Sequence, residues 1–297
     1  MDNKGIMQTT LVYQTEDLDS SKSKLINEHP ELSEVSINPP ILWKLVSEVP
    51  VGNVAAYSSG KIVIQSLNND WAKGILTSLN NGSQDDFVPH IGVDEAGKGD
   101  FFGPLVTCAL YVPNSEVASQ LQMEGVRDSK TISDSTILKL YEKIVQTCPD
   151  YSVVTIGPKR LTELLGKSRN INKTLAWAHS QAIENVLEKV GDECHKVVID
   201  QFSKKKSRVL DALMENGKKL EIVQKHGGES DVAVAAASIV ARAVFVMEMD
   251  KLSEKYSVKF PKGASDVIEF ASDFKSKYGM EKLEEVAKTS FKISSRI

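Results

Sequence analysis

Two adjacent carboxylates, Asp94 and Glu95, end a short apolar run and are followed by a glycine-rich turn, all within residues 91–104. Because neighbouring side chains of a strand point to opposite faces of a sheet, the two acids can share one site only if regular strand pairing stops there. Gly97 and Gly99 permit such a stop, since glycine adopts positive φ and lets a ligand approach the backbone amides. The segment predicts a site for a polyanion and a metal, with a hairpin turn carrying solvated acids as an equal alternative.

Two further acids stand where predicted elements end or begin. Asp200 ends a buried-type strand, and Asp231 precedes a helix with many small residues that can lie close against a sheet. The alternative for Asp200 is a solvated acid after a strand. The alternative for Asp231 is a helix N-cap, which is the usual role of Asp at that position.

Four carboxylates at one site cannot all stay ionised without help. A pair about 4 Å apart repels by about 4 kcal/mol at an effective dielectric of 20. Divalent cations relieve this repulsion, and a ligand set made only of oxygen atoms favours magnesium or manganese over zinc. Two such ions can stabilise the attacking and leaving oxygens of a phosphodiester. The predicted reaction class is therefore metal-assisted phosphoryl transfer.

The composition is that of an ordinary soluble protein, with 297 residues, 41% hydrophobic and 26% charged. Its three cysteines, Cys108, Cys148 and Cys194, are far apart and lack C-x-x-C spacing, which argues against a disulfide framework and a zinc site. No basic segment followed by an apolar core opens the chain, and no apolar run is expected to reach membrane-spanning length. We expect a cytoplasmic protein with no membrane contact and no obligate protein partner.

The charge differs between the two parts of the chain. Residues 1–88 hold six Lys, no Arg and eleven acidic residues, a net charge of −5, which leaves 30 basic and 29 acidic residues in 89–297. If metal neutralises the candidate acids, the remaining surface of the second part is basic. The acidic total therefore does not exclude a nucleic-acid substrate, although it argues against a non-specific binder with a large counterion-release term.

The first part is predicted to be a small α+β unit. We expect strands at 9–13, 54–57 and 61–65, helices at 18–26 and from Asp70 as N-cap, and an apolar segment of uncertain type at 41–49. The polar, turn-rich segment 80–86 is predicted to be a linker.

The second part alternates strands and helices, which predicts an α/β domain with a mixed sheet. Strands are expected at 89–94, 103–112, 151–156, 196–201 and 219–224, and helices at 134–147, 158–165, 171–190, 203–215, 231–256, 266–278 and 280–288. In such sheets a site forms where strands end and helices begin.

Several motifs stand in the order seen in type 2 ribonucleases H. They are residues 94–99 (DEAGKG), 128–130 (DSK), 170–172 (NIN), 199–200 (ID), and Asp231 followed by 237–242 (ASIVAR). Residues 100–104 (DFFGP) and 260–264 (FPKGA) resemble the ribonuclease HIII branch in particular. Residues 57–61 (YSSGK) with Gln65 resemble the extra N-terminal domain of that branch, which is similar to one half of a TATA-binding-protein fold. The resemblance covers nearly the whole chain.

This resemblance implies a ribonuclease H-like mixed sheet flanked by helices, residues 89–297, preceded by a TATA-binding-protein-like substrate-binding domain with its linker, residues 1–88. It implies an endonuclease that hydrolyses the RNA strand of RNA–DNA hybrids and leaves 5′-phosphate and 3′-hydroxyl ends. Magnesium is the expected cofactor, and manganese is expected to substitute.

The same resemblance assigns roles to individual residues. The catalytic and metal-binding acids would be Asp94, Glu95, Asp200 and Asp231. The substrate-binding residues would be Gly97, Lys98 and Gly99 along the ribose 2′-hydroxyls, Lys130 near a phosphate, and Tyr57 and Lys61 in the first domain. Lys98 departs from the related ribonucleases HII, which usually carry Arg there.

Three alternatives remain open at this point. The nearest is ribonuclease HII-like excision of single ribonucleotides from duplex DNA, although neither Tyr256 nor Tyr278 stands in the ribonuclease HII motif that recognises the junction to deoxyribose. The others are a non-catalytic nucleic-acid-binding protein, against which the intact acid set argues, and an ATP-using phosphotransferase, whose paired phosphate loops are not evident. His226, close to Asp231 in sequence, is a minor candidate for proton transfer.

Overall fold

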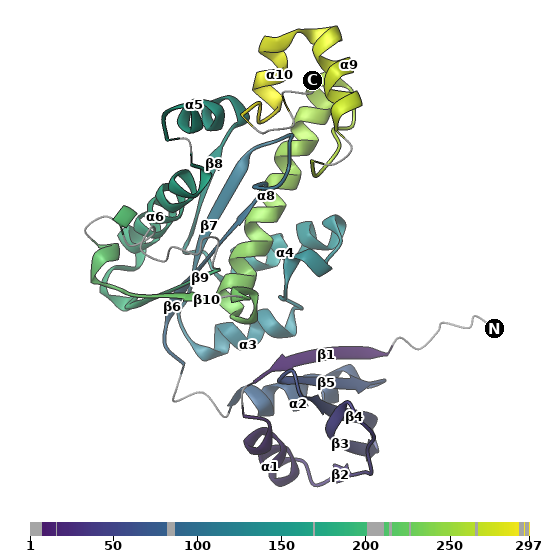
Figure 1. Cartoon of the computed structure of the whole chain (residues 1–297). Helices are drawn as coiled ribbons and strands as arrows, with labels where there is room; N and C mark the ends of the chain where they lie inside the picture. Colours follow the sequence, from purple (N-terminus) through teal and green to yellow (C-terminus); the bar gives the residue numbers. More distant parts are fainter. Residues whose placement is uncertain are drawn as a thin grey trace, which may run out of the picture. The chain divides into compact units, whose positions relative to one another are not determined.

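The computed structural model describes residues 8–15, 17–81, 87–168, 170–200, 211–213, 216–225, 227–264, 267–290, 294 and 297. The chain divides into two compact units, Met1–Phe87 and Val88–Ile297, and each is described by itself (Figure 1).

The first unit is an antiparallel sheet packed with two helices. Its elements are β1 (Thr9–Gln14), α1 (Leu18–Glu28), β2 (Ser33–Glu34), β3 (Ile41–Glu48), β4 (Val51–Tyr57), β5 (Lys61–Ser66) and α2 (Asn69–Asn81), with the strand order β1-β5-β4-β3-β2. Helix α2 packs against β1 and β5, and α1 packs against α2. Ile62 and Ile64 of β5 are fully buried, whereas Lys61, the first residue of the same strand, is exposed. One face of the sheet is therefore the core, and the other carries polar and half-buried side chains.

Two expectations for this unit were wrong. Helix α2 begins at Asn69, and the side chain of Asn68 accepts a hydrogen bond from the backbone N–H of Trp71, 3.0 Å away. Asn68 is therefore the cap, and Asp70 lies in the first turn. Asn81 ends α2, so residues 80 and 81 of the predicted linker are helical, and residues 82–86 lie outside the described part. The segment of uncertain type, 41–49, forms strand β3.

The second unit is a mixed sheet between helices, as the sequence predicts. Its elements are β6 (His90–Ala96), β7 (Leu105–Val112), α3 (Ser115–Met123), α4 (Asp134–Thr147), β8 (Tyr151–Ile156), α5 (Pro158–Ser168), α6 (Ile171–Val190), β9 (Lys196–Asp200), β10 (Glu221–Lys225), α8 (Val232–Tyr256), α9 (Ile268–Tyr278) and α10 (Met280–Val286). The strand order is β10-β9-β6-β7-β8. Strands β6, β9 and β10 are parallel, and β7 is antiparallel to both β6 and β8. Helix α3 was not predicted, and the predicted helix 203–215 falls mostly outside the described residues.

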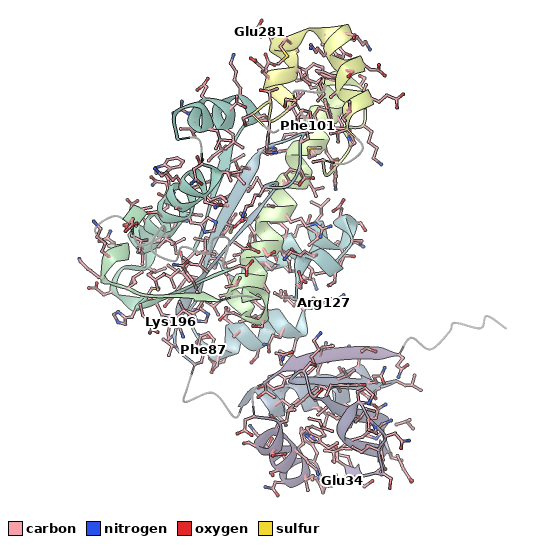
Figure 2. The ribbon with its side chains drawn as sticks, in the orientation of Figure 1. Glu34, Phe87, Phe101, Arg127, Lys196 and Glu281 are labelled. Carbon is pink, nitrogen blue, oxygen red and sulfur yellow. The ribbon has the colours of Figure 1, made fainter. Side chains whose placement is uncertain are left out.

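Helices α6 and α8 cover opposite faces of the sheet (Figure 1). The odd-numbered residues Ile91 and Val93 of β6 pack in one apolar cluster with α6. On the other face, a Cβ added to Gly92 would overlap the backbone of Ala233 and Val234 in α8. Glycine at this position and small residues in the helix let α8 lie directly on β6. The side chains that fill both layers are drawn in Figure 2.

Helix α8 also corrects the expectation that no segment reaches membrane-spanning length. It has 25 residues and is apolar enough to span a membrane by length and composition, although most of its apolar part is buried inside the protein. Its apolar composition is that of a core helix packed on a sheet.

Candidate active site

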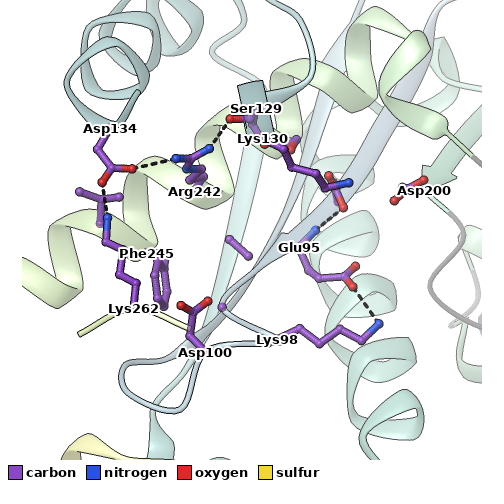
Figure 3. Close-up of a pocket in the computed structure, with 16 residues that line it drawn as sticks. Glu95, Lys98, Asp100, Ser129, Lys130, Asp134, Asp200, Arg242, Phe245 and Lys262 are labelled. Carbon is purple, nitrogen blue, oxygen red and sulfur yellow. Dashed lines mark hydrogen bonds and ion pairs between the residues drawn. The ribbon is translucent and has the colours of Figure 1, made fainter. Parts of the chain in front are cut away.

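A cavity of about 410 Å³ opens at the end of β6, and three of the four predicted acids line it: Asp94, Glu95 and Asp200. Asp94 and Glu95 belong to β6, and Asp200 is the last residue of β9. Because these strands are parallel neighbours, their carboxyl ends lie at the same edge of the sheet. The cavity also contains the predicted substrate-binding residues Gly97, Lys98, Gly99 and Lys130 (Figure 3).

Strand pairing at the two acids differs from the expectation. The parallel ladder with β9 ends at the pair Val93↔Ile199, so pairing stops on that side. The antiparallel ladder with β7 continues through Asp94↔Cys108 and Glu95↔Thr107, so regular pairing does not stop on the other. The two acids therefore lie on opposite faces of β6 and reach one cavity around its free edge.

Each acid is held by a different helix. Asp94 accepts a hydrogen bond from the backbone N–H of Glu95, 2.7 Å away, and another from Ser238 in α8. Glu95 lies 3.1 Å from Nε2 of the buried His179 in α6 and 3.2 Å from Nζ of Lys98. The sheet thus separates the partners of two acids that are adjacent in sequence.

The two environments move the acids' pKa values in opposite directions. Burial raises the pKa of Asp94 to about 7, and the charges of Glu95 and Asp200 add to the shift. Burial also raises the pKa of Glu95, but His179 and Lys98 outweigh burial and hold that pKa below its ordinary value. Of these two neighbours, Asp94 is therefore the one whose ionisation is opposed by its surroundings.

The carboxylate oxygens of Asp94, Glu95 and Asp200 are the kind of ligand that a hard divalent cation prefers. Such a cation would also relieve the repulsion of Asp94 by the charges of Glu95 and Asp200. Within the described residues, however, no group of three or more His, Cys, Asp or Glu side chains is arranged to hold a metal ion. The three acids share one cavity, and the charges of Glu95 and Asp200 act on Asp94.

Asp231 lies elsewhere. Its carboxylate is 3.1 Å from Nε2 of His90 and accepts backbone hydrogen bonds from Ala233 and Val234, at 3.0 and 3.2 Å, as the N-cap of α8. His90 and Asp94 are four residues apart in the same strand, which places their Cα atoms about 13 Å apart. Asp231 does not line the cavity. Its grouping with the other acids is therefore not found, and the N-cap alternative describes its position.

A different segment contacts Asp200. The short turn Gly228–Ser230 places the backbone N–H of Gly228 3.0 Å from Oδ1 of Asp200, and a Cβ on Gly228 would come within 2.8 Å of the Cα of Asp200. Glu229 is the acidic residue of this turn. Sequence reasoning gave the fourth acid as Asp231, which stands at the start of the helix. The two glycines before Glu229 were the available signal for a close backbone approach.

Basic side chains line the other side of the cavity (Figure 3). Asp134 pairs with Arg242, 2.9 Å away, and with Lys262. Arg242 also donates to the carbonyl of Ser129, whose hydroxyl is 2.6 Å from that of Ser238. Asp134 was not among the predicted site residues, because its role depends on segments more than 100 residues away in sequence.

The remaining predicted residues lie outside this cavity. Tyr57 ends β4 and Lys61 begins β5, so they flank the hairpin turn of the first unit. His226 and the basic segment 204–208 lie outside the described residues.

Replacing Asp231 by Ala tests its role as a helix cap. The change removes the acceptor for two backbone N–H groups of α8, so the free energy of unfolding should fall by about 1 to 2 kcal/mol. Asp231→Asn keeps an acceptor oxygen and should lose less. Denaturant unfolding followed by circular dichroism measures both, with Asp250→Ala at an exposed position of α8 as a control. Equal stability of Asp231→Ala and the unmodified protein would contradict the cap.

Comparisons with known proteins agree with this architecture. The family described as Ribonuclease HII matches residues 91–294. The chain is 34% identical over 288 residues to a Ribonuclease HIII of Chlamydia felis, covering 94% of this chain and 95% of that protein. It is 38% identical over 246 residues to a Ribonuclease HIII of Protochlamydia amoebophila, covering 80% of each.

Solved structures show the same fold. The crystal structure of Bst-RNase HIII in complex with Mn²⁺ matches with a TM-score of 0.68 at 25% identity, covering 97% of each chain. Aquifex aeolicus RNase H3 matches with a TM-score of 0.55 at 26% identity, covering 94% of this chain and 98% of that one. The expected fold class is confirmed. The chain therefore belongs to the ribonuclease HIII branch of the ribonuclease HII family, and it is a hydrolase of the ribonuclease H type.

Proposed function

We propose that this protein is a cytoplasmic endonuclease that cuts the RNA strand of RNA–DNA hybrids with divalent-metal assistance, leaving 5′-phosphate and 3′-hydroxyl ends. The observation that carries the proposal is the cavity in which Asp94, Glu95 and Asp200 face a glycine loop and several basic side chains. Membership of the ribonuclease HIII branch supplies the substrate class.

The proposal assigns the metal to Asp94, Glu95 and Asp200, with magnesium preferred and manganese able to substitute. Its support is the carboxylate donor set and the similarity to a protein crystallised with Mn²⁺. Such ions stabilise charge on the attacking and leaving oxygens and lower the pKa of a bound water. The turn that carries Glu229 contacts Asp200, whereas Asp231 caps α8, so the proposal takes Glu229 as the fourth acid.

The chain's own residues would bind and orient the substrate. Lys98 and Lys130, with Arg242 and Lys262 on the other side, offer positive charge to backbone phosphates, which position a nucleic acid without reading its sequence (Figure 3). The backbone at Gly99 has room for a ribose 2′-hydroxyl, the group that distinguishes RNA from DNA, because a Cβ there would meet nothing within 4 Å, whereas Gly97 packs against Pro104 and Phe245.

The open face of the first unit is proposed to bind the hybrid as well. The cross-strand pairs Asn53↔Gln65 and Ala55↔Val63 lie on this face of β4 and β5, and Tyr57 and Lys61 continue it toward the turn. The ring of Tyr57 suits stacking with a base or sugar, and the polar groups beside it suit contacts with the backbone of a nucleic acid. The net charge of −5 on residues 1–88 argues that stacking and hydrogen bonding contribute more than bulk charge.

Neutral isosteres of the cavity acids test the catalytic assignment. Asp94→Asn, Glu95→Gln and Asp200→Asn keep the shape but remove metal-binding charge, so cleavage of a labelled hybrid in magnesium should fall by about three orders of magnitude or more. Glu229→Gln should behave like them, and Asp231→Asn should stay within about tenfold of the unmodified enzyme. Circular dichroism controls for folding. Near-normal turnover in any two of the first three variants would refute the site.

The first unit is tested by deleting residues 1–88 and, in the full chain, by the double variant Tyr57→Ala/Lys61→Ala. Both should raise the Michaelis constant for a hybrid much more than they lower turnover, because binding is lost while the cavity is intact. Lys73→Ala, on helix α2, is the matched control. Unchanged binding by the truncated protein would give this unit another role.

A last test separates hybrid cleavage from excision of single ribonucleotides. Tyr256 and Tyr278 pack against each other with ring centroids 5.2 Å apart, and neither lines the cavity. With no tyrosine among the described cavity residues to read a junction to deoxyribose, we expect several 2′-hydroxyls to be required. A duplex with a short run of ribonucleotides should be cut about 100-fold faster than the same duplex with one. Equal rates would favour excision of single ribonucleotides.

A further inference from the structure

A buried lysine supports the loop that lines the cavity. Lys288, which follows α10, has no exposed surface. Its Nζ donates hydrogen bonds to three backbone carbonyls, those of Asp100 at 2.8 Å, Phe102 at 3.3 Å and Gly103 at 2.6 Å. These residues belong to the glycine loop, residues 97–103, which connects β6 to β7.

The backbone around Lys288 pairs with the same loop. The N–H of Lys288 donates to the carbonyl of Phe101 at 2.8 Å, and the N–H of Gly103 donates to that of Val286 at 2.9 Å. Phe102 and Ala287 form an antiparallel bridge between these bonds. The C-terminal segment 286–288 therefore runs beside the second half of the glycine loop.

A second segment holds the loop from another side. The N–H of Gly263 donates to Oδ1 of Asp100 at 2.6 Å, and its carbonyl accepts from the N–H of Phe101 at 2.8 Å. The ring of Phe102 packs against Phe260, with centroids 5.1 Å apart. Phe101 is fully buried and lies near the C-terminal helices (Figure 2). Residues 100–103 of the loop are thus anchored by these contacts, while Gly97, Lys98 and Gly99 in its first half line the cavity.

The chemistry of the anchor is unusual for a purely structural contact. Burying an ammonium is costly, and an apolar side chain of similar volume often stabilises a fold as well or better. Burial lowers the pKa of Lys288 to about 7, and the charge of Asp100 opposes that shift. The ammonium form has three N–H donors, one for each carbonyl, whereas a neutral amine has two. The carbonyls point inward where the loop turns at Gly103, which has a φ of +80°.

We propose that Lys288 is a positioning residue that acts through Asp100, Phe102 and Gly103 to hold the glycine loop in its substrate-binding shape. Lys288 does not line the cavity, so it acts without touching the substrate. The inference rests on the proposed function for the identity of the substrate, but not for the state of the loop.

The experiment compares Lys288→Met, which keeps the side-chain length and removes all three donors, with Lys282→Met, at a lysine of α10 that pairs with Glu285 on the surface. For Lys288→Met we expect the Michaelis constant for a labelled hybrid to rise about tenfold or more, with a smaller change in turnover. Backbone amides of 97–103 should exchange hydrogen faster, while α6 and β7 keep their protection. Lys282→Met should match the unmodified enzyme in both measurements.

An unchanged Michaelis constant and unchanged exchange in the loop would overturn the inference, as would faster exchange spread evenly over the whole unit. If Lys288→Met does not fold, Lys288→Gln, which keeps two N–H donors, carries the same comparison. Failure of both variants to fold would make Lys288 a structural residue and also overturn it. If the unmodified protein does not cleave hybrid, the proposed function fails, and exchange in 97–103 alone still decides the role of Lys288.

Discussion

The site depends on the point at which the parallel ladder between β6 and β9 ends. The last pair is Val93↔Ile199, and beyond it β6 has a partner only on the β7 side. A strand with one free edge lets side chains from both of its faces reach the same space, so Asp94 and Glu95 meet in one cavity although they point in opposite directions. If the ladder continued for two more residues, the sheet itself would separate them.

Helices on the two faces then give two neighbouring carboxylates different surroundings. His179 of α6 and Lys98 favour the ionised form of Glu95, whereas burial and the adjacent charges oppose ionisation of Asp94. Crowded like charges at a buried sheet edge do not stabilise a fold. Their presence is the kind of conflict between local energetics and structure that marks a functional site.

Features that depend on local chain chemistry were readable from the sequence, and features that depend on tertiary contacts were not. Asp94, Glu95 and Asp200 could be placed together because each stands at or near the carboxyl end of an apolar strand. The sequence could not separate the two roles of Asp231, because an Asp before a helix can be its cap or a metal ligand, and the contact of Gly228 with Asp200 appears only in the fold. Helix α3 was missed because it buries only Ala118 and Leu121, too few for an apolar stripe. The cap by Asn114 was its one local signal.

The net charge of the chain, −4, says little about the surface that a substrate meets. The basic residues of the cavity come from separate segments: Lys98 from the glycine loop, Lys130 from the turn after α3, Arg242 from α8 and Lys262 from the segment that follows it. No run of basic residues marks them in the sequence, because only the fold brings them together. Two of them share Asp134, which holds them at the cavity wall and lowers the local positive charge. Under the proposed function, a substrate phosphate at this wall must compete with the carboxylate of Asp134 for the same two side chains.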